Sequence, residues 1–446
     1  MPSRATRRDN LNQLPLSMKI HFITFGCKAN QYDTEKFRQE FQARGAEVVD
    51  SPGEADACVV NTCTVTNRAD AVARKAIRRV KRDHPDVRVL VAGCSAALHP
   101  AMYHEMEAVD DVVGGHDAVK VAERIAPEAP LLERHEEPIG ARLLERNERG
   151  TRAWMKIQDG CDRRCSFCAT RLARGASRSR QPDELVEEAK KLAQHHAEIV
   201  FTGIHIGHYG RDLRSHGDDQ THTLASLAER LLAEVPKVRF RLGSIEATEI
   251  DDHLLDLLAT SEGRLVPHLH IPMQAGSDNV LRAMRRWHTR EQYRSRVLEI
   301  ADRLPYLGLG ADVIVGFPGE SDDDFAQTRE LVEELPFTYL HVFPYSERDG
   351  TAAVELSNKV HSRVAAARSK ELRDIAMQKG TAYRQSRAGD TAQVIVESTG
   401  RGLTEDYLRV DLEGVSDDDV GRLITVSLSV NDDGELSAPV EVSAII

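Results

Sequence analysis

Residues 151–168, TRAWMKIQDGCDRRCSFC, decide how this 446-residue chain folds. An apolar segment that favours a β-strand runs directly into three cysteines with C-x3-C-x2-C spacing, Cys161, Cys165 and Cys168. Three thiolates this close can converge on one centre, as an iron–sulfur cluster requires. A structural zinc site normally takes four protein ligands, and no fourth cysteine follows nearby. We therefore predict a four-iron cluster with one open iron, and a zinc loop or free thiols are the weaker alternatives.

Downstream of this loop, strand-like and helix-like segments alternate as far as TYLHVFPYS, residues 338–346. Six strand-plus-helix pairs predict a partial (β/α)6 barrel over residues 150–381, with functional groups at the carboxyl ends of its strands. A long polar helix from about Asn358 to Lys379 is expected to close this unit. The short alternating segments TAQVIVES, YLRVDL, RLITVSLSV and PVEVSAII then predict a small β-barrel over residues 384–446.

Upstream, residues 18–138 alternate in the same way and predict a βαβ-type parallel sheet, which places the chain in the α/β class. The runs KIHFITFG, ACVVN and VRVLVAG each lead to a cysteine, namely Cys27, Cys63 and Cys94. Because parallel strands end at the same edge of a sheet, these thiols are expected to gather there. Cys58 lies inside ACVVN and is predicted to be a buried structural cysteine. A charged, proline-containing stretch at residues 126–150 is expected to be a linker.

The composition is that of a folded soluble protein, with 41% hydrophobic and 29% charged residues and no apolar run long enough to span a membrane. Seven cysteines without an export signal favour reduced thiols and a cytoplasmic location. The net charge of −12 argues against a general nucleic-acid coat protein. Residues 151–180 nevertheless hold 8 basic and 2 acidic side chains, whereas residues 384–446 hold 5 basic and 13 acidic ones.

The cysteine loop resembles that of the radical S-adenosylmethionine (SAM) enzymes, and the segments around it are similar to the methylthiotransferases among them. The similarity runs from about Met18 to the C-terminus. It rests on TFGCKANQYDTE, VVNTCTVTN, VAGCSA, MKIQDGCDRRCSFC, TGIHIGHYG, HLHIPMQAGSD, DVIVGFPGES and HVFPYS. NTCTVTN and GIHIGHYG are most similar to the MtaB-like subfamily, which modifies threonylcarbamoyladenosine in tRNA.

The resemblance implies two [4Fe–4S] clusters and SAM as cofactors. The C-x3-C-x2-C cysteines would hold the cluster whose open iron binds SAM, and reductive cleavage of SAM would give a 5′-deoxyadenosyl radical. The three strand-end cysteines would hold an auxiliary cluster carrying the sulfur, which a second SAM methylates. The net reaction would replace C–H by C–SCH3 at C2 of N6-threonylcarbamoyladenosine, the nucleoside beside the anticodon.

Three alternatives stay open at this point. They are methylthiolation of isopentenyladenosine in tRNA, methylthiolation of a ribosomal-protein aspartate, and a non-catalytic iron–sulfur protein that binds RNA or transfers electrons. The last class would bind tRNA without cleaving SAM. The resemblance also implies an electron donor such as flavodoxin or ferredoxin, and a sulfur source that resupplies the auxiliary cluster.

Residues at the cluster loop and the strand ends of the predicted barrel are candidates for binding SAM, and these are Phe167, Gly203, Ser244, Glu246, Gln274 and Phe343. The alternative for Gly203 is a glycine required at a barrel corner, and for Phe343 it is an aromatic of the barrel core. For the polar residues it is a solvated strand end. His268 and His270 alternate along one strand and are predicted to be hydrogen-bonded core histidines rather than ligands.

Two basic patches are candidates for RNA contact. The first is an arginine run whose donors suit phosphate, comprising Arg163, Arg164, Arg171, Arg174, Arg178 and Arg180. The second adds an aromatic ring for a splayed base and comprises Arg282, Arg285, Arg286, Trp287 and Arg290. A solvated charged face is the alternative for both patches.

The segment GLTEDYLRVDL near the C-terminus resembles a TRAM domain, which implies tRNA binding. The excess of acidic residues around it predicts repulsion from a phosphate backbone. This segment therefore either binds RNA through a small basic face, which we favour, or serves to position the barrel.

Overall fold

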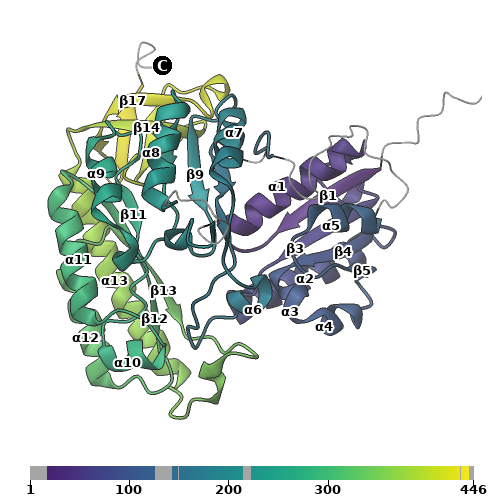
Figure 1. Cartoon of the computed structure of the whole chain (residues 1–446), viewed down its shortest axis with the longest axis horizontal. Coiled ribbons are helices and arrows are strands. Elements are labelled where there is room, and N and C mark those ends of the chain that lie inside the picture. The colour runs from purple at the N-terminus through teal and green to yellow at the C-terminus, as the bar shows by residue number, and fades with distance from the viewer. Residues whose placement is uncertain (1–17, 126–142, 149, 214–221, 432, 441–446) are drawn as a thin grey trace, which may run out of the picture. The chain divides into compact units, whose positions relative to one another are not determined.

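The computed structural model describes residues 18–125, 143–148, 150–213, 222–431 and 433–440. The chain divides after Arg142 into two compact units (Figure 1). The expected linker lies largely outside the described residues, and so does most of the last expected strand, PVEVSAII. No helix in the described ranges is long and apolar enough to cross a membrane.

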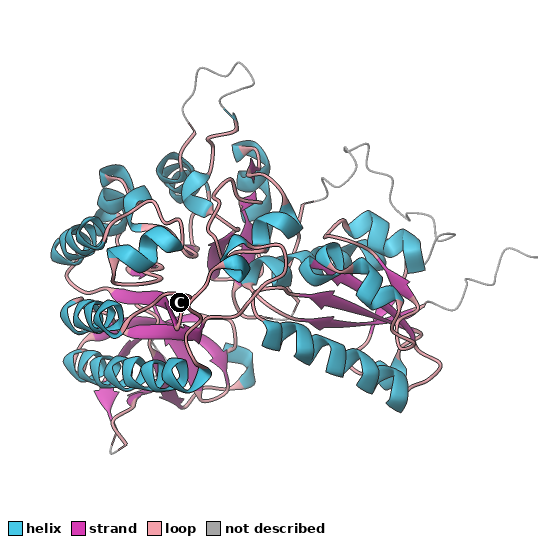
Figure 2. Ribbon diagram, turned by 90° about the horizontal axis from the view of Figure 1, so that it is seen from below, coloured by secondary structure: helices cyan, strands magenta, loops and turns pink. Residues whose placement is uncertain are grey.

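The first unit is built on a five-stranded parallel sheet with the order β2-β1-β3-β4-β5, as predicted. The strands are β1 Lys19–Thr24, β2 Glu47–Val48, β3 Ala57–Thr62, β4 Arg88–Gly93 and β5 Asp111–Val112. The helices are α1 Lys28–Ala43, α2 Asn67–Asp83, α3 Cys94–Leu98, α4 Pro100–His104 and α5 Ala118–Ile125. Helices cover both faces of this sheet (Figure 2).

Alternation along β3 explains the two cores of the first unit. Val59 faces the core that contains Phe37 and Phe41 of α1, whereas Val60 faces the core that contains Ile77 of α2. Successive side chains of a strand point to opposite faces, so a strand covered on both sides is apolar throughout. All six residues of β3 are buried.

The second unit begins with six parallel strands that follow one another along the chain, β6 Ala153–Lys156, β9 Glu198–Thr202, β10 Arg239–Arg241, β11 His268–His270, β12 Gly308–Val315 and β13 Tyr339–Pro344. They form two hydrogen-bonded groups, β10-β9-β6 and β11-β12-β13. Isolated parallel bridges, such as the one from Ser244 to His270, connect the groups. No pairing joins β6 to β13 in the described part of the chain, so the barrel is partial, as predicted.

Helices follow these strands, and all of them except the first begin at side-chain caps. They are α7 Pro182–Leu192, α8 Leu224–Glu234, α9 Asp252–Thr260, α10 Asp278–Ala283, α11 Arg290–Arg303 and α12 Asp322–Glu334. Thr223, Thr289 and Ser321 form capping boxes at the starts of α8, α11 and α12. A shorter helix, α6 Thr170–Arg174, follows the cysteine loop.

The closing helix, α13 Ser362–Ser386, starts and ends later than the predicted span. The side chain of His361 accepts a hydrogen bond from the Arg363 amide and fixes the start. Gly380, a residue type that commonly follows a helix end, lies inside the helix instead. A Cβ atom there would lie 2.9 Å from the Thr338 carbonyl oxygen, so glycine lets α13 approach the barrel.

The C-terminal region is a curled mixed sheet with the order β17-β14-β15-β16-β19-β18. Its strands are β14 Thr391–Ser398, β15 Arg401–Thr404, β16 Arg409–Glu413, β17 Leu423–Ser427, β18 Ser429–Val430 and β19 Leu436–Pro439. β15 was not expected from the sequence, because glycine is rare inside strands. Gly402 belongs there because a Cβ atom would lie 2.2 Å from Val394 Cγ1 on β14.

Two of the three acids of the TRAM-like motif, Glu405 and Asp406, are buried rather than solvated. Arg387 at the end of α13 donates to Glu405 at 3.3 Å and to Asp406 at 2.9 Å. Tyr383 donates to Asp406 at 2.8 Å, and Tyr306 donates to Glu405 at 3.1 Å. These contacts join the C-terminal sheet to the barrel unit and support the positioning alternative for this segment.

Candidate functional site

The strand-end cysteines of the first unit lie at one edge of its sheet. Cys63 follows β3 directly and Cys94 follows β4 directly, and the strands pair in parallel up to Thr62 and Gly93. Cys27 follows neighbouring β1 and precedes α1. The predicted placement at the carboxyl edge is therefore confirmed.

Gly26 and Asn30 contact the loops that carry the strand-end cysteines and hold these loops close together. Gly26, at φ +103°, lies so close to Cys63 that a Cβ atom on it would be 2.6 Å from the Cys63 sulfur. The Asn30 amide nitrogen donates to the carbonyl oxygens of Phe25 and Thr62, both at 2.8 Å. The Cys94 thiol lies 3.8 Å from Asn30 Oδ1, so Asn30 touches all three loops.

The cysteines of the first unit differ in environment. Cys63 and Cys94 are buried, whereas Cys27 is exposed. Cys58 is fully buried within β3, and burial raises the pKa of its thiol to about 12. The prediction of a structural role for Cys58 is consistent with this burial, because the side chain packs in the core with Val60 and Ile77.

The second cysteine group lies on a loop between two short paired strands, β7 Gln158–Asp159 and β8 Arg178–Ser179. The Cys161 amide donates to the Gly175 carbonyl at 3.1 Å and the Cys168 amide donates to the Cys165 carbonyl at 3.2 Å. Burial raises the pKa of Cys161 to about 11, and Cys168 and Cys165 add to the shift by charge repulsion. The three thiols stand on one short loop, and their spacing is the one expected for a single iron–sulfur cluster.

Of the candidate SAM-binding residues near the cysteine loop, some already make contacts within the chain and one is exposed. Phe167 packs edge-on against Phe317, with ring centres 6.5 Å apart. A Cβ atom on Gly203 would lie 2.7 Å from the Gln158 carbonyl oxygen, which favours the barrel-corner alternative for this glycine. Ser244 is exposed.

Farther along the barrel, Gln274 adopts a left-handed backbone conformation with φ +65°. Non-glycine residues in this conformation are strained, and such strain concentrates at functional sites. Phe343 is 38% exposed, so the alternative that it is an aromatic of the barrel core is wrong. The partial barrel leaves this end of β13 uncovered.

The two barrel histidines are buried and hydrogen-bonded, as the core interpretation expects. His268 Nε2 lies 2.8 Å from the Tyr339 hydroxyl. His270 Nδ1 lies 3.2 Å from the same hydroxyl, and His270 Nε2 lies 3.1 Å from Asp312. His341 on β13 binds the same Asp312 oxygen at 3.2 Å, and its side chain is 55% exposed.

The first basic patch is not a continuous surface, which corrects the sequence-based expectation. The Arg174 side chain is 1% exposed and donates to both oxygens of Asp159, at 2.9 and 3.1 Å. Arg180 binds both oxygens of Glu188, at 3.0 and 2.8 Å. Of the other members, Arg164 and Arg178 are exposed, and Arg163 and Arg171 are half-buried.

The second basic patch is not a continuous surface either, which corrects the expectation that all its members are open to RNA. The Arg286 side chain is 3% exposed and forms an ion pair with buried Glu246, so both groups already have a partner. The Trp287 ring is covered by the guanidinium groups of Arg163 and Arg286, whose carbons lie 4.0 and 4.1 Å from its centre. These two contacts already use the ring that was expected to stack on a base. Arg282 and Arg285 are exposed, and Arg290 is half-buried.

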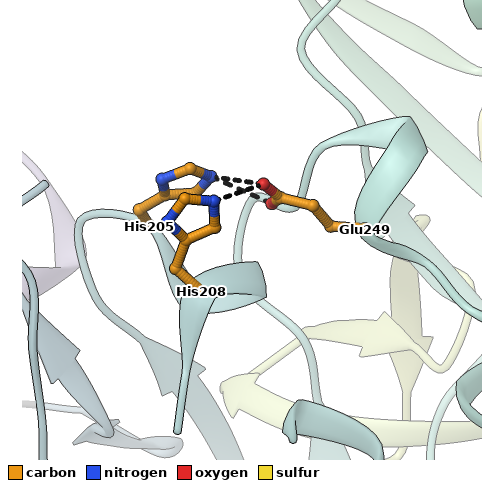
Figure 3. Close-up of side chains that lie close together, drawn as sticks. All are labelled: His205, His208 and Glu249. Atoms are coloured by element: carbon orange, nitrogen blue, oxygen red, sulfur yellow. Dashed lines mark hydrogen bonds and ion pairs between the residues drawn. The ribbon is translucent and has the colours of Figure 1, made fainter. Parts of the chain in front are cut away.

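Sequence reasoning assigned no role to a cluster of His205, His208 and Glu249 (Figure 3). The stacked imidazole rings lie 3.8 Å apart, and both point their Nε2 atoms at the Glu249 carboxylate, at 2.9 and 3.0 Å. On its other side, His205 Nδ1 lies 3.5 Å from the Cys161 sulfur. The H-x2-H spacing in TGIHIGHYG was the one sequence feature that could have indicated this cluster. It was not sufficient, because Glu249 lies 44 residues after His205.

Comparison with known families assigns both units. Residues 19–115 match the family described as uncharacterized protein family UPF0004, and residues 155–332 match the radical SAM superfamily. The first match contains the strand-end cysteines, and the second contains the C-x3-C-x2-C loop and most of the barrel.

Similar proteins cover nearly the whole chain. The threonylcarbamoyladenosine tRNA methylthiotransferase MtaB of Bacillus subtilis is 36% identical over 92% of this chain and 93% of its own length. The MtaB of Aquifex aeolicus is 35% identical over 92% and 100%. A tRNA-2-methylthio-N(6)-dimethylallyladenosine synthase of Bacillus velezensis is 30% identical over 92% and 83%.

Among solved structures, the radical S-adenosylmethionine methyltransferase TsrM of Kitasatospora setae has a TM-score of 0.53 with this chain. The identity is 14%, and the match covers 74% of this chain and 72% of that chain. At this identity the likeness shows a shared fold.

Proposed function

The chain belongs to the radical SAM methylthiotransferase family, and from that premise we propose that it methylthiolates C2 of N6-threonylcarbamoyladenosine beside the anticodon of tRNA. The observation that carries this proposal is the 36% identity to an MtaB enzyme over nearly the full length of both chains. The dimethylallyladenosine synthases are the second branch, at 30% identity.

Two [4Fe–4S] clusters and SAM are the cofactors of this family. Cys161, Cys165 and Cys168 would hold one cluster, and the strand-end cysteines would hold the other. When bound, these groups supply a radical that removes hydrogen from an unactivated C–H bond and the sulfur that replaces it.

The chain's own residues prepare both sites. The loop of the second unit is anchored by Ser166, whose hydroxyl donates to the Ala283 carbonyl at 2.7 Å and whose amide donates to the Met284 carbonyl at 3.0 Å. In the first unit, Asn30 and Gly26 hold the cysteine loops at a fixed spacing. Such anchoring keeps ligands oriented before a cluster binds.

A polar group of residues in the barrel favours threonylcarbamoyladenosine over dimethylallyladenosine. Asp312 lies between His270 and His341, and the His341 side chain is 55% exposed. A threonylcarbamoyl substituent offers a carboxylate, a hydroxyl and amide groups to such side chains, whereas a dimethylallyl group is a hydrocarbon. A hydrocarbon packed against the exposed His341 side chain would displace water without offering it a hydrogen bond in return, which is costly.

The remaining partners follow from the same chemistry. Phosphate contacts would fall to the exposed arginines Arg164, Arg178 and Arg285, since Arg174 and Arg286 are held by carboxylates. A low-potential electron donor such as flavodoxin or ferredoxin would reduce the SAM-binding cluster. A sulfur source would refill the auxiliary site after each turnover, and a cytoplasmic location would place the enzyme with its tRNA.

Nucleoside analysis tests the substrate. A deletion strain should lose 2-methylthio-N6-threonylcarbamoyladenosine from its tRNA, and the wild-type gene should restore it. Mass spectrometry that finds this nucleoside unchanged, with a methylthiolated dimethylallyl nucleoside lost instead, would assign the chain to the other branch.

Two cysteine variants test the division of labour. The anaerobically reconstituted enzyme should hold about eight irons. Cys165→Ala should abolish 5′-deoxyadenosine formation from SAM and dithionite. Cys63→Ala should retain it and abolish methylthio transfer. A protein that binds tRNA and never forms 5′-deoxyadenosine would be a non-catalytic iron–sulfur protein.

A further inference from the structure

We propose that Arg286, held by Glu246 and Trp287, is a positioning residue for Cys165 that raises the reduction potential of the cluster on the C-x3-C-x2-C loop. This inference rests on the proposed function, because it concerns the cluster that the radical SAM family holds there. It assigns to Arg286 a role inside the barrel in place of the RNA contact expected from the sequence.

The contact to the cysteine is direct. Arg286 Nη1 lies 3.6 Å from the Cys165 sulfur. Arg286 Nη2 binds a Glu246 oxygen, and the Arg286 side chain is 3% exposed. A guanidinium group has a rigid planar fork, so the bond to Glu246 on one edge fixes the direction of the other. That direction is toward Cys165.

A second chain of contacts reaches Cys161 in the same way. His205 Nδ1 lies 3.5 Å from the Cys161 sulfur, and its Nε2 lies 2.9 Å from Glu249 (Figure 3). Glu249 lies against Gly207, where a Cβ atom would be 2.1 Å from its carboxylate oxygen. A side chain at Gly207 would push Glu249 away from His205.

Trp287 joins the two chains of contacts. Arg163 donates to Glu249 at 3.3 Å, and its guanidinium carbon lies 4.0 Å from the Trp287 ring centre. The Arg286 guanidinium lies at 4.1 Å from the same ring. The path from Cys165 through Arg286, Trp287, Arg163 and Glu249 to His205 and Cys161 is continuous.

The physical consequence follows from charge. Reduction adds an electron to a cluster, so hydrogen bonds and positive charge at a ligand sulfur favour the reduced form. The barrel interior screens this effect less than water does, because the groups are buried. Removing the guanidinium should therefore make the cluster harder to reduce and slow SAM cleavage at a fixed reductant concentration.

The test uses the full-length reconstituted chain with Cys63→Ala, so that the EPR signal comes from the cluster on the C-x3-C-x2-C loop alone. EPR-monitored redox titration compares this parent with Arg286→Met and Arg286→Lys. We expect Arg286→Met to keep about four irons and to titrate at a more negative potential, by about 59 mV for each tenfold loss in the reduction equilibrium. Arg286→Lys, which keeps the charge, should recover part of the shift. Arg282→Met, on an exposed position of α10, should match the parent.

The possible results distinguish failure of the inference about Arg286 from failure of the proposed function. An Arg286→Met potential equal to that of the parent would overturn the inference. If Arg286→Met loses its iron while Arg286→Lys keeps it, the positioning role is supported, whereas loss of iron from both would overturn it. These readouts need no tRNA, so they hold or fail independently of which nucleoside is modified.

Discussion

Glu198 in β9 and Arg241 in β10 form an ion pair that is closed to solvent, with Arg241 Nε donating to Glu198 Oε1 at 2.7 Å and both side chains 0% exposed. Arg239 binds the second carboxylate oxygen at 2.6 Å. The side chains of both arginines also reach the C-terminal sheet. Arg239 donates to the Gln393 carbonyl at 2.7 Å, and Arg241 donates to the Glu405 carbonyl at 2.9 Å. One carboxylate therefore binds two guanidinium groups that connect this sheet to the barrel.

Glu198→Gln should destabilise the second unit strongly. The substitution leaves two buried guanidinium groups without their negative partner, and breaking a buried pair costs about 3–5 kcal/mol. Urea denaturation followed by circular dichroism measures the loss. Glu184→Gln is the matched control, since Glu184 is 47% exposed and lies 4.0 Å from Arg180. Its effect should stay within about 0.5 kcal/mol, and equal losses in the two variants would contradict the structural account.

The same carboxylate predicts a pH dependence. Burial alone would raise the pKa of Glu198, but the charges of Arg241 and Arg239 outweigh it and hold the pKa well below its usual range. A carboxyl with a depressed pKa stabilises the fold above its unfolded pKa of about 4.3, and that stabilisation is lost as the pH falls. The difference in unfolding free energy between wild type and Glu198→Gln should thus be largest near neutral pH and shrink below about pH 5. A difference that is constant down to acid pH would refute this assignment.

The sequence was sufficient to place the cysteines but not their surroundings. Cys27, Cys63 and Cys94 each follow an apolar run, and the parallel sheet brings the ends of such runs together whatever their separation along the chain. Strand period and turn chemistry act locally, so a single sequence reveals them. The six barrel strands were found for the same reason.

The surroundings depend on partners that are distant in sequence. Arg286 looked like a surface cation because its neighbours are basic, and its carboxylate, Glu246, lies 40 residues earlier. Arg174 in α6 likewise meets Asp159 of β7, which lies 15 residues earlier. An arginine run therefore shows where positive charge accumulates, while the fold determines which members remain at the surface.

The exposed arginines give a prediction for tRNA binding. Arg178→Ala combined with Arg285→Ala should weaken tRNA binding and lower the slope of log affinity against log salt by about one for each phosphate that the variant no longer neutralises. Filter binding at several salt concentrations measures both quantities. Arg373→Ala, at an exposed position of α13, is the control and should leave affinity and slope unchanged. If the double variant binds like wild type, these arginines do not bind the tRNA backbone.

Gly26 and Gly115 provide a matched pair for testing the auxiliary site. Both have left-handed backbone conformations, with φ +103° and φ +96°, so alanine strains both by about 1–2 kcal/mol. A Cβ atom at Gly26 would lie 2.6 Å from the Cys63 sulfur, whereas a Cβ atom at Gly115 would meet nothing within 4 Å. The two substitutions therefore differ in the clash with the cysteine, while the backbone cost is shared.

Gly26→Ala should displace Cys63 and empty the auxiliary site. Iron should fall from about eight to about four per chain, and 5′-deoxyadenosine formation should persist while methylthio transfer stops. Gly115→Ala should keep both iron and transfer near wild-type levels. Colorimetric iron analysis together with assays of the two products distinguishes these results. Full iron content in Gly26→Ala would mean that the Cys63 sulfur is not a ligand held at this edge of the sheet, because no cluster could tolerate its ligand being pushed aside.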